Sequence, residues 1–265
     1  MRRPTRKSFE YCSKLHLHKC TLRGRCYTII MPRSGIHIRW ATNFYHETWH
    51  ILGTMNSTQF LGHLMWDLSF HKDPYTYVYI DQSLLVCNPF DARPSDPILI
   101  GKLKPPSELC LYLKNKRPPS HKSYRLKSQS LTKIINDKSA RGEFYRKNSL
   151  NKQILQVSRI KGVITLSGGM HALQSEGVSA AFMYTIPGDY FDKMDYHGIW
   201  QKDKVDGEFQ IFHDFYHQVG AAKSADRLIR QKYPAPRSKY EEDLIIDRIQ
   251  SLSWKLFQAR RRKKT

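Results

Sequence analysis

Hydrophobic and polar positions in the first third of the chain predict strands around one helical region. Two runs of strand-forming residues flank Pro32–Gly35, so residues 26–40 are expected to form a β-hairpin. Residues 43–70 are rich in Phe, Trp, Leu and Met, which favours one or two helices with Asn43 as a candidate N-cap. Residues 75–80 alternate in the manner of a strand.

The C-terminal part of the chain shows longer hydrophobic periods. Over residues 154–164 apolar side chains recur at helical spacing. An apolar run over 180–186 stops at a Pro-Gly pair and predicts a buried strand. Two helices are expected at 209–230 and 241–260, and the second has acidic residues at its start and basic residues at its end, as the helix macrodipole favours.

Proline and positive charge set the middle of the chain apart. Seven prolines within residues 88–123 predict loop or linker. Between residues 102 and 161, sixteen Lys and Arg stand against three Asp and Glu. The predicted class is therefore α+β, with an N-terminal unit over 1–100, a basic Pro-rich linker over 101–150 and a C-terminal helix–strand–helix unit over 151–265.

Composition indicates the cellular compartment in which the protein is expected. The chain has 265 residues, 40% of them hydrophobic, which is enough for a folded core. No apolar run is long enough for a transmembrane helix, and no apolar segment follows the basic residues 1–7 as a secretory signal requires. The five cysteines include no C-x-x-C pair. These features predict a protein of a reducing, cytoplasmic compartment without a membrane partner.

Charge gives the strongest functional signal. With 44 Lys and Arg against 23 Asp and Glu, the formal net charge is +21. Such an excess favours DNA as a partner, with cations on phosphates and Tyr and Trp stacked on single-stranded bases. The alternative is a basic structural or interaction protein without chemistry. The candidate nucleic-acid contacts are Lys122, Arg125, Lys127, Arg146, Lys147, Arg260, Arg261 and Arg262.

A second candidate site has the pattern H-E-x-x-H. On a helix, His46 and His50 would share one face and bind Zn²⁺, and Glu47 would be the general base of a zinc hydrolase. Asn56 occupies the position where the longer signature has a third ligand. The zinc hydrolase is therefore the alternative function.

Residues 154–197 carry a resemblance to a known family. Arg159–Gly162, a helix with a Gly-containing turn, and the expected strand at 181–187 resemble the first conserved block of the phage replication gene A protein family, the rolling-circle initiators. Gly188 and Phe191 depart from its usual Ser and His. Helix 241–260 is similar to the helix before that family's catalytic strand. The matching positions of the block are Phe182, Thr185, Pro187 and Tyr190.

The resemblance implies a specific chemistry. Members of that family nick one DNA strand through a Tyr nucleophile, and a divalent metal, Mg²⁺ or Mn²⁺, is held by a strand with the pattern His-hydrophobic-His. Neither that strand nor a helical Tyr pair follows residue 187 here. We therefore expect an incomplete single-strand nuclease domain that binds DNA in phage or mobile-element replication. Whether this chain alone is an endonuclease, and whether it holds any metal, is left open.

Overall fold

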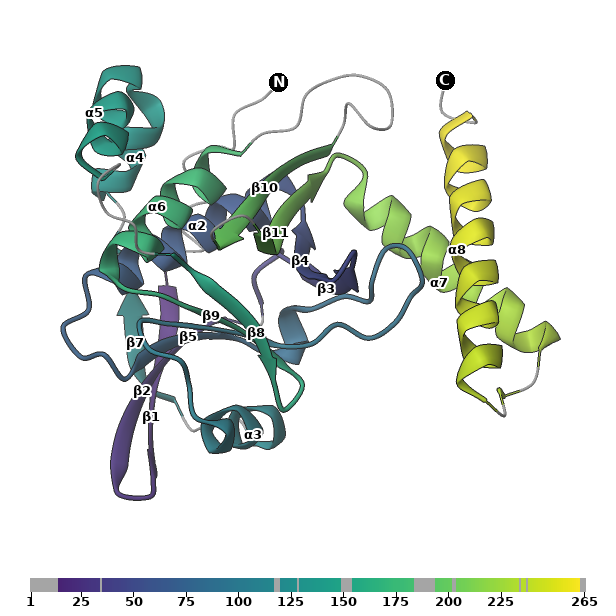
Figure 1. Ribbon diagram of the computed structural model, residues 1–265, viewed down its shortest axis with the longest axis horizontal. Helices are drawn as coiled ribbons and strands as arrows, with labels where there is room; N and C mark the ends of the chain where they lie inside the picture. Colours follow the sequence, from purple (N-terminus) through teal and green to yellow (C-terminus); the bar gives the residue numbers. More distant parts are fainter. Residues whose placement is uncertain are drawn as a thin grey trace.

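The computed structural model describes residues 14–33, 35–116, 120–127, 129–148, 154–183, 194–201, 204–233, 235–236 and 238–262. Figure 1 shows that these residues build two mixed β-sheets with helices packed around them. The predicted α+β class is confirmed.

The larger sheet has seven strands and forms the centre of the molecule. Across the sheet the order is β7 (Ser120–Arg125), β1 (Lys14–Leu22), β2 (Arg25–Pro32), β5 (Thr76–Ile80), β6 (Ile98–Gly101), β9 (Val163–Ser167) and β8 (Gln156–Ile160). The β2–β5 and β6–β9 pairs are parallel and the other four are antiparallel. Strands β7 and β8 are therefore its two opposite edges.

Side chains of the central strands alternate between two hydrophobic cores, because successive residues of a strand point to opposite faces. One face packs against α2 (Met55–Ser69) and α6 (Met170–Phe182), and the other against α3 (Ser107–Asn115). The first core includes Ile30, Val78, Ile98 and Ile100, and the second includes Ile29, Tyr77, Tyr79 and Leu99.

Helices α2 and α6 cross with their backbones in contact. A Cβ on Gly62 of α2 would lie only 2.5 Å from the carbonyl oxygen of Gly177 and 2.6 Å from the amide nitrogen of Ala181 in α6. Glycine is required here because a side chain would separate the helices. Beside this crossing, α4 (Gln129–Asn136) and α5 (Lys138–Asn148) cover Trp66 of α2.

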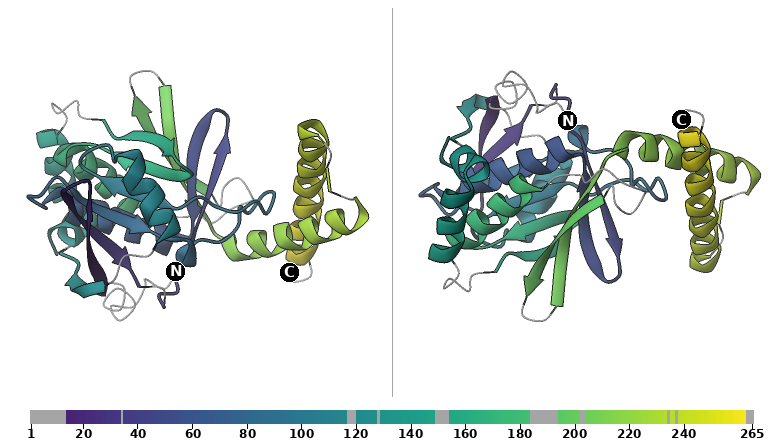
Figure 2. Two further views of the ribbon diagram at one scale, coloured as in Figure 1. Left: turned by 90° about the horizontal axis from the view of Figure 1, so that it is seen from below. Right: turned by 90° about the horizontal axis from the view of Figure 1, so that it is seen from above.

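The smaller sheet joins the C-terminal helices to the body. Its order is β10 (Met194–Gln201), β11 (Lys204–Phe212), β4 (Thr48–Gly53) and β3 (Trp40–Tyr45). The start of α7 (Phe215–Lys232) packs on this sheet, and α7 then packs along α8 (Lys239–Arg262). Both views of Figure 2 show this helix pair extending from one end of the molecule.

Several expected elements of the N-terminal part are wrong. The hairpin expected at 26–40 is instead β1–β2, which turns at Arg23–Gly24. The helical region expected at 43–70 begins with the β3–β4 hairpin, and only α2 is helical. Asn43 lies in β3, and Thr54 caps α2 by accepting a hydrogen bond from the amide of Ser57. The strand expected at 75–80 is confirmed as β5.

In the C-terminal part, two expected elements change type, one helix begins later than expected and one helix is confirmed. Residues 154–164 lie in the β8–β9 hairpin and not in a helix: β9 is buried along its whole length, and β8 pairs with it as the edge strand of the sheet. Residues 180–182 belong to helix α6 and not to a strand. The helix expected from 209 begins at Phe215, after β11. The helix expected at 241–260 is confirmed as α8.

The Pro-rich segment is not simply loop. Within 88–123 lie the buried strand β6, helix α3 and the beginning of β7. Residues 101–150, expected as a linker, also contain α4 and α5. Because β6 pairs with β9, strands that come before and after the expected linker belong to one sheet.

Candidate nucleic-acid interface

The structure places the eight predicted cations on three separate elements. Lys122 and Arg125 lie on edge strand β7, and Lys127 follows it; all three side chains are exposed. The pair at 146–147 lies on α5, and the run at 260–262 ends α8, at the opposite end of the molecule in Figure 1. The predicted set therefore does not form one surface.

Two of these groups also have partners within the chain. Nζ of Lys147 lies 2.6 Å from Oε1 of Glu143 one turn earlier in α5. Nη2 of Arg260 donates to Oγ of Ser224 over 3.2 Å, which ties α8 to α7. Part of this positive charge therefore stabilises the helices that carry it.

A different basic cluster forms at the other edge of the large sheet, where β8 turns into β9. The two turn residues, Lys161 and Gly162, have positive φ angles of 53° and 74°, as a tight two-residue hairpin turn requires. A Cβ on Gly162 would collide with Nζ of Lys114 and lie 3.7 Å from Nη2 of Arg159. The turn thus gathers three cationic residues from α3, β8 and its own tip.

Most of this cluster has no neutralising partner among the residues that the structure describes. Lys114, Lys161 and also Lys116, which caps the end of α3, are exposed, and none has an ion pair with a carboxylate in the described part of the chain. Arg159 does pair with Asp96, with Nε 2.5 Å from Oδ2, and this hydrogen bond raises the pKa of the guanidinium.

A pocket of about 380 Å³ opens beside these lysines. It lies where β5 ends and α3 ends. Its lining residues are Tyr79, Asp81, Gln82, Ser83, Pro97, Leu113, Lys114, Asn115 and Lys116.

Aromatic rings adjoin the basic cluster. Phe44 of β3 and Trp49 of β4 pack with their ring centroids 4.7 Å apart, and Phe44 is 50% exposed. The Arg159 guanidinium carbon lies 5.7 Å from the Trp49 ring centroid, so this arginine connects the rings to the lysines. We call Phe44, Trp49, Lys114, Lys116, Arg159 and Lys161 the basic–aromatic surface.

The H-E-x-x-H residues do not form the expected helical zinc site. His46 and Glu47 are the turn of the β3–β4 hairpin, with φ angles of 49° and 60°, and His50 lies within β4. Nε2 of His50 is 2.8 Å from Oγ1 of Thr48, and burial lowers its pKa. Among the residues that the structure describes, no three His, Cys, Asp or Glu side chains are grouped to hold a metal.

The motif block of the family resemblance is described only in part. Phe182 ends α6, and the Arg141 guanidinium carbon lies 3.9 Å from its ring centroid. The strand implied at 181–182 is therefore wrong. Thr185, Pro187 and Tyr190 lie outside the described residues.

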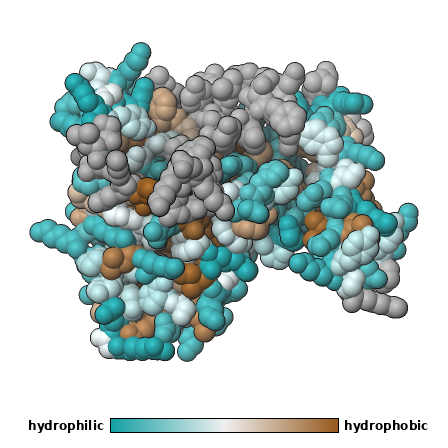
Figure 3. Space-filling model, viewed as in Figure 1, coloured by the Kyte–Doolittle hydropathy of each residue, from teal (hydrophilic) through white to brown (hydrophobic). Residues whose placement is uncertain are grey.

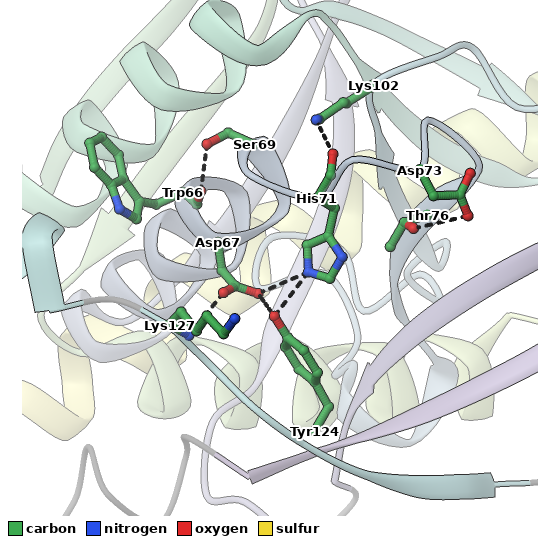
Figure 4. A network of polar contacts seen from close by, with 9 residues as sticks. All are labelled: Trp66, Asp67, Ser69, His71, Asp73, Thr76, Lys102, Tyr124 and Lys127. Atoms are coloured by element: carbon green, nitrogen blue, oxygen red, sulfur yellow. Dashed lines mark hydrogen bonds and ion pairs between the residues drawn. The ribbon is translucent and has the colours of Figure 1, made fainter.

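A polar network binds the opposite edge strand to α2 (Figure 4). The hydroxyl of Tyr124 on β7 donates to Oδ2 of the buried Asp67 over 2.6 Å and lies 2.9 Å from Nε2 of His71. The backbone amide of Lys127 donates to Oδ1 of the same carboxylate. Burial and the Asp67 hydrogen bond raise the pKa of Tyr124, so the phenol stays protonated as a structural donor. It therefore lacks the lowered pKa of an activated nucleophile.

Comparison of the chain with protein-family models, curated proteins and solved structures found no significant match. The described helices include none that is both long and apolar enough to span a bilayer. The basic–aromatic surface was missed in the sequence, although three of its lysines fall within the basic span 102–161. No local sequence signal predicts that Trp49 lies beside Arg159, because this contact depends on how the smaller sheet packs against the larger one.

Proposed function

We propose that this protein binds single-stranded nucleic acid, with DNA as the expected partner, on the basic–aromatic surface. The observation that carries the proposal is the position of Arg159. Its guanidinium lies beside Trp49 on one side and beside Lys114 and the β8–β9 turn on the other. Cations for phosphates and rings for bases therefore lie close together around Arg159.

The two kinds of side chain serve different parts of the ligand. Lys114, Lys116 and Lys161 contribute positive charge to the phosphate backbone, and this contribution does not depend on sequence. The exposed ring of Phe44 offers a stacking face to a base. Bases in a duplex are already stacked on each other, so this feature favours a single strand.

A role in phage-type or mobile-element DNA replication belongs to the same proposal. It is supported by the resemblance of Arg159–Gly162 and of α8 to the rolling-circle initiators, together with the charge excess. The zinc-hydrolase alternative loses its basis, since His46 and Glu47 form a hairpin turn. We propose binding without assigning a nucleophile or a metal to the described residues.

The test compares two triple variants that remove equal charge from opposite edges of the large sheet. In K114Q/K116Q/K161Q the basic–aromatic surface loses three cations. In the matched control K122Q/R125Q/K127Q, the β7 edge loses three. Affinity for a fluorescent oligodeoxythymidylate is measured by anisotropy at low salt. We expect a loss of about tenfold or more in the first variant and less than about threefold in the control. Equal losses would show that only net charge matters, and no loss in the first variant would refute the surface.

A further inference from the structure

A basic groove lies between α7 and α8, away from the basic–aromatic surface. It has a volume of about 270 Å³. Figure 3 shows hydrophilic side chains over most of the α8 surface turned toward the viewer. The residues that line the groove are Ile229, Lys232, Tyr233, Arg248, Ser251, Leu252 and Lys255.

The groove contains three cations and no carboxylate. Lys232, Arg248 and Lys255 are exposed, and none forms an ion pair with a carboxylate in the described ranges. Arg230 on the same helix behaves differently: it pairs with Asp226 at 2.7 Å and with Glu242 at 3.0 Å. The helix pair therefore neutralises a neighbouring cation and leaves these three available to an anion.

The helix macrodipole accounts for the position of only one of the three cations. Lys232 lies in the last turn of α7, where the macrodipole favours a positive charge. Arg248 and Lys255 lie in the interior of the 24-residue helix α8, where that effect is absent. They are seven residues apart, so they stand two turns apart on one face, and Ser251 lies between them.

One cation is held in place before any ligand arrives. The Arg248 guanidinium carbon lies 4.2 Å from the centroid of the Tyr233 ring, and Nζ of Lys232 lies 5.9 Å from the same centroid. Tyr233 is half-buried and packs against the buried cluster of the helix pair, which restricts the ring. An arginine fixed in this way loses less side-chain entropy on binding and can present two N–H groups to one anion.

We propose that this groove binds a phosphate group, with Arg248 as its main contact, Lys232 and Lys255 as flanking charges and the Ser251 hydroxyl as a donor. A phosphate fits this set because it is multiply charged and accepts hydrogen bonds on several oxygens, whereas a carboxylate offers two. The phosphate comes either from a free phosphorylated molecule or from a nucleic-acid backbone. The proposal does not depend on the basic–aromatic surface.

The test uses inorganic pyrophosphate as the probe and titration calorimetry of the full chain. In R248Q/K255Q we expect at least about tenfold weaker binding. The control R227Q/K239Q removes two exposed cations from the same helix pair outside the groove and should change affinity less than about threefold. Tyr233→Leu keeps an apolar floor but removes the ring under Arg248, and an intermediate loss is expected. Unchanged binding in R248Q/K255Q, or an equal loss in the control, would overturn the proposal.

A second arm identifies the source of the phosphate. Oligodeoxythymidylate affinity is measured for wild type and R248Q/K255Q. A loss that parallels the pyrophosphate loss assigns the groove to a nucleic-acid backbone, and an unchanged value assigns it to a free phosphorylated ligand. Because K114Q/K116Q/K161Q tests the basic–aromatic surface separately, failure of one site is distinguishable from failure of the other.

Discussion

The salt dependence of DNA binding gives a quantitative test of the basic–aromatic surface. Each cation that contacts a phosphate of a single strand releases counterions and contributes about 0.7 to the slope of log affinity against log salt. Removing Lys114, Lys116 and Lys161 should therefore reduce that slope by about 2. Between about 50 and about 200 mM salt, the affinity advantage of wild type over the variant should shrink by about 20-fold.

The assay is fluorescence anisotropy of a labelled oligodeoxythymidylate at four or more salt concentrations, with wild type, K114Q/K116Q/K161Q and K122Q/R125Q/K127Q. The β7-edge control should keep the wild-type slope, because its three cations lie at the other edge of the sheet. Parallel lines for wild type and the first variant would refute the reasoning, since they would mean that these lysines do not contact phosphate. Reduced slopes in both variants would mean that binding is diffuse.

Three further predictions test the rings, the helix crossing and a buried histidine. Trp49→Ala should weaken oligonucleotide binding by about 1–3 kcal/mol through lost stacking, while Trp254→Ala on α8 should not, and an unchanged anisotropy titration for Trp49→Ala would remove the ring from the site. Gly62→Ala should lower the free energy of unfolding in urea by about 1–3 kcal/mol, because its Cβ meets backbone atoms of α6; a change below about 0.5 kcal/mol would mean that the helices separate easily. Burial lowers the pKa of His63 from 6.5 to about 4, so the unfolded chain takes up a proton between these values and stability falls as pH falls through that window, by up to about 3 kcal/mol. His63→Gln should flatten the urea-unfolding curve of stability against pH there, and a slope equal to wild type would contradict the assignment.

Prediction from the sequence was right for elements whose helix or strand type follows from their own residues. It was wrong for elements whose type depends on packing against distant parts of the chain. Helix α8 was predictable because its apolar positions, such as Ile245 and Ile249, recur at helical spacing between acidic and basic ends. The 154–164 segment was mistaken for a helix because its apolar positions come from two strands and the turn between them: Val157 of β8 packs against the first core and Ile160 against the second, while every residue of β9 is buried. The apolar run at 180–186 predicted a strand, but its first residues, 180–182, end α6, where Ala181 lies against Gly62 of α2.

The sequence predicted that the candidate site would be positively charged, but it did not predict which lysines lie together in space. The basic span 102–161 includes both Lys122 at one sheet edge and Lys161 at the other, and nothing local distinguishes them. Their separation depends on the strand order, in which β7 pairs with β1 although more than 90 residues separate their first residues. Pairing at such distances is set by the whole fold.

The turn of the β3–β4 hairpin gives a final test that separates backbone strain from binding. Tyr45 pairs with Thr48, so His46 and Glu47 alone form the turn, and both have positive φ. The turns at residues 23–24 and 161–162 have the same pattern but place Gly second, where this turn places Glu47.

A non-glycine residue in this conformation costs about 1–2 kcal/mol, so Glu47→Gly should stabilise the chain by about 1 kcal/mol in urea unfolding. Glu47→Ala is the matched control, because it removes the same carboxylate while keeping the strained backbone, and it should bring no such gain. If both variants stabilise equally, the carboxylate and not the backbone is unfavourable. If neither does, the left-handed conformation is not strained at this turn.

The same two variants also test binding. Since Glu47 comes two residues before Trp49 in the chain and carries negative charge, both variants should bind oligonucleotide at least as well as wild type. A weaker complex in both would instead give the carboxylate a role in the basic–aromatic surface.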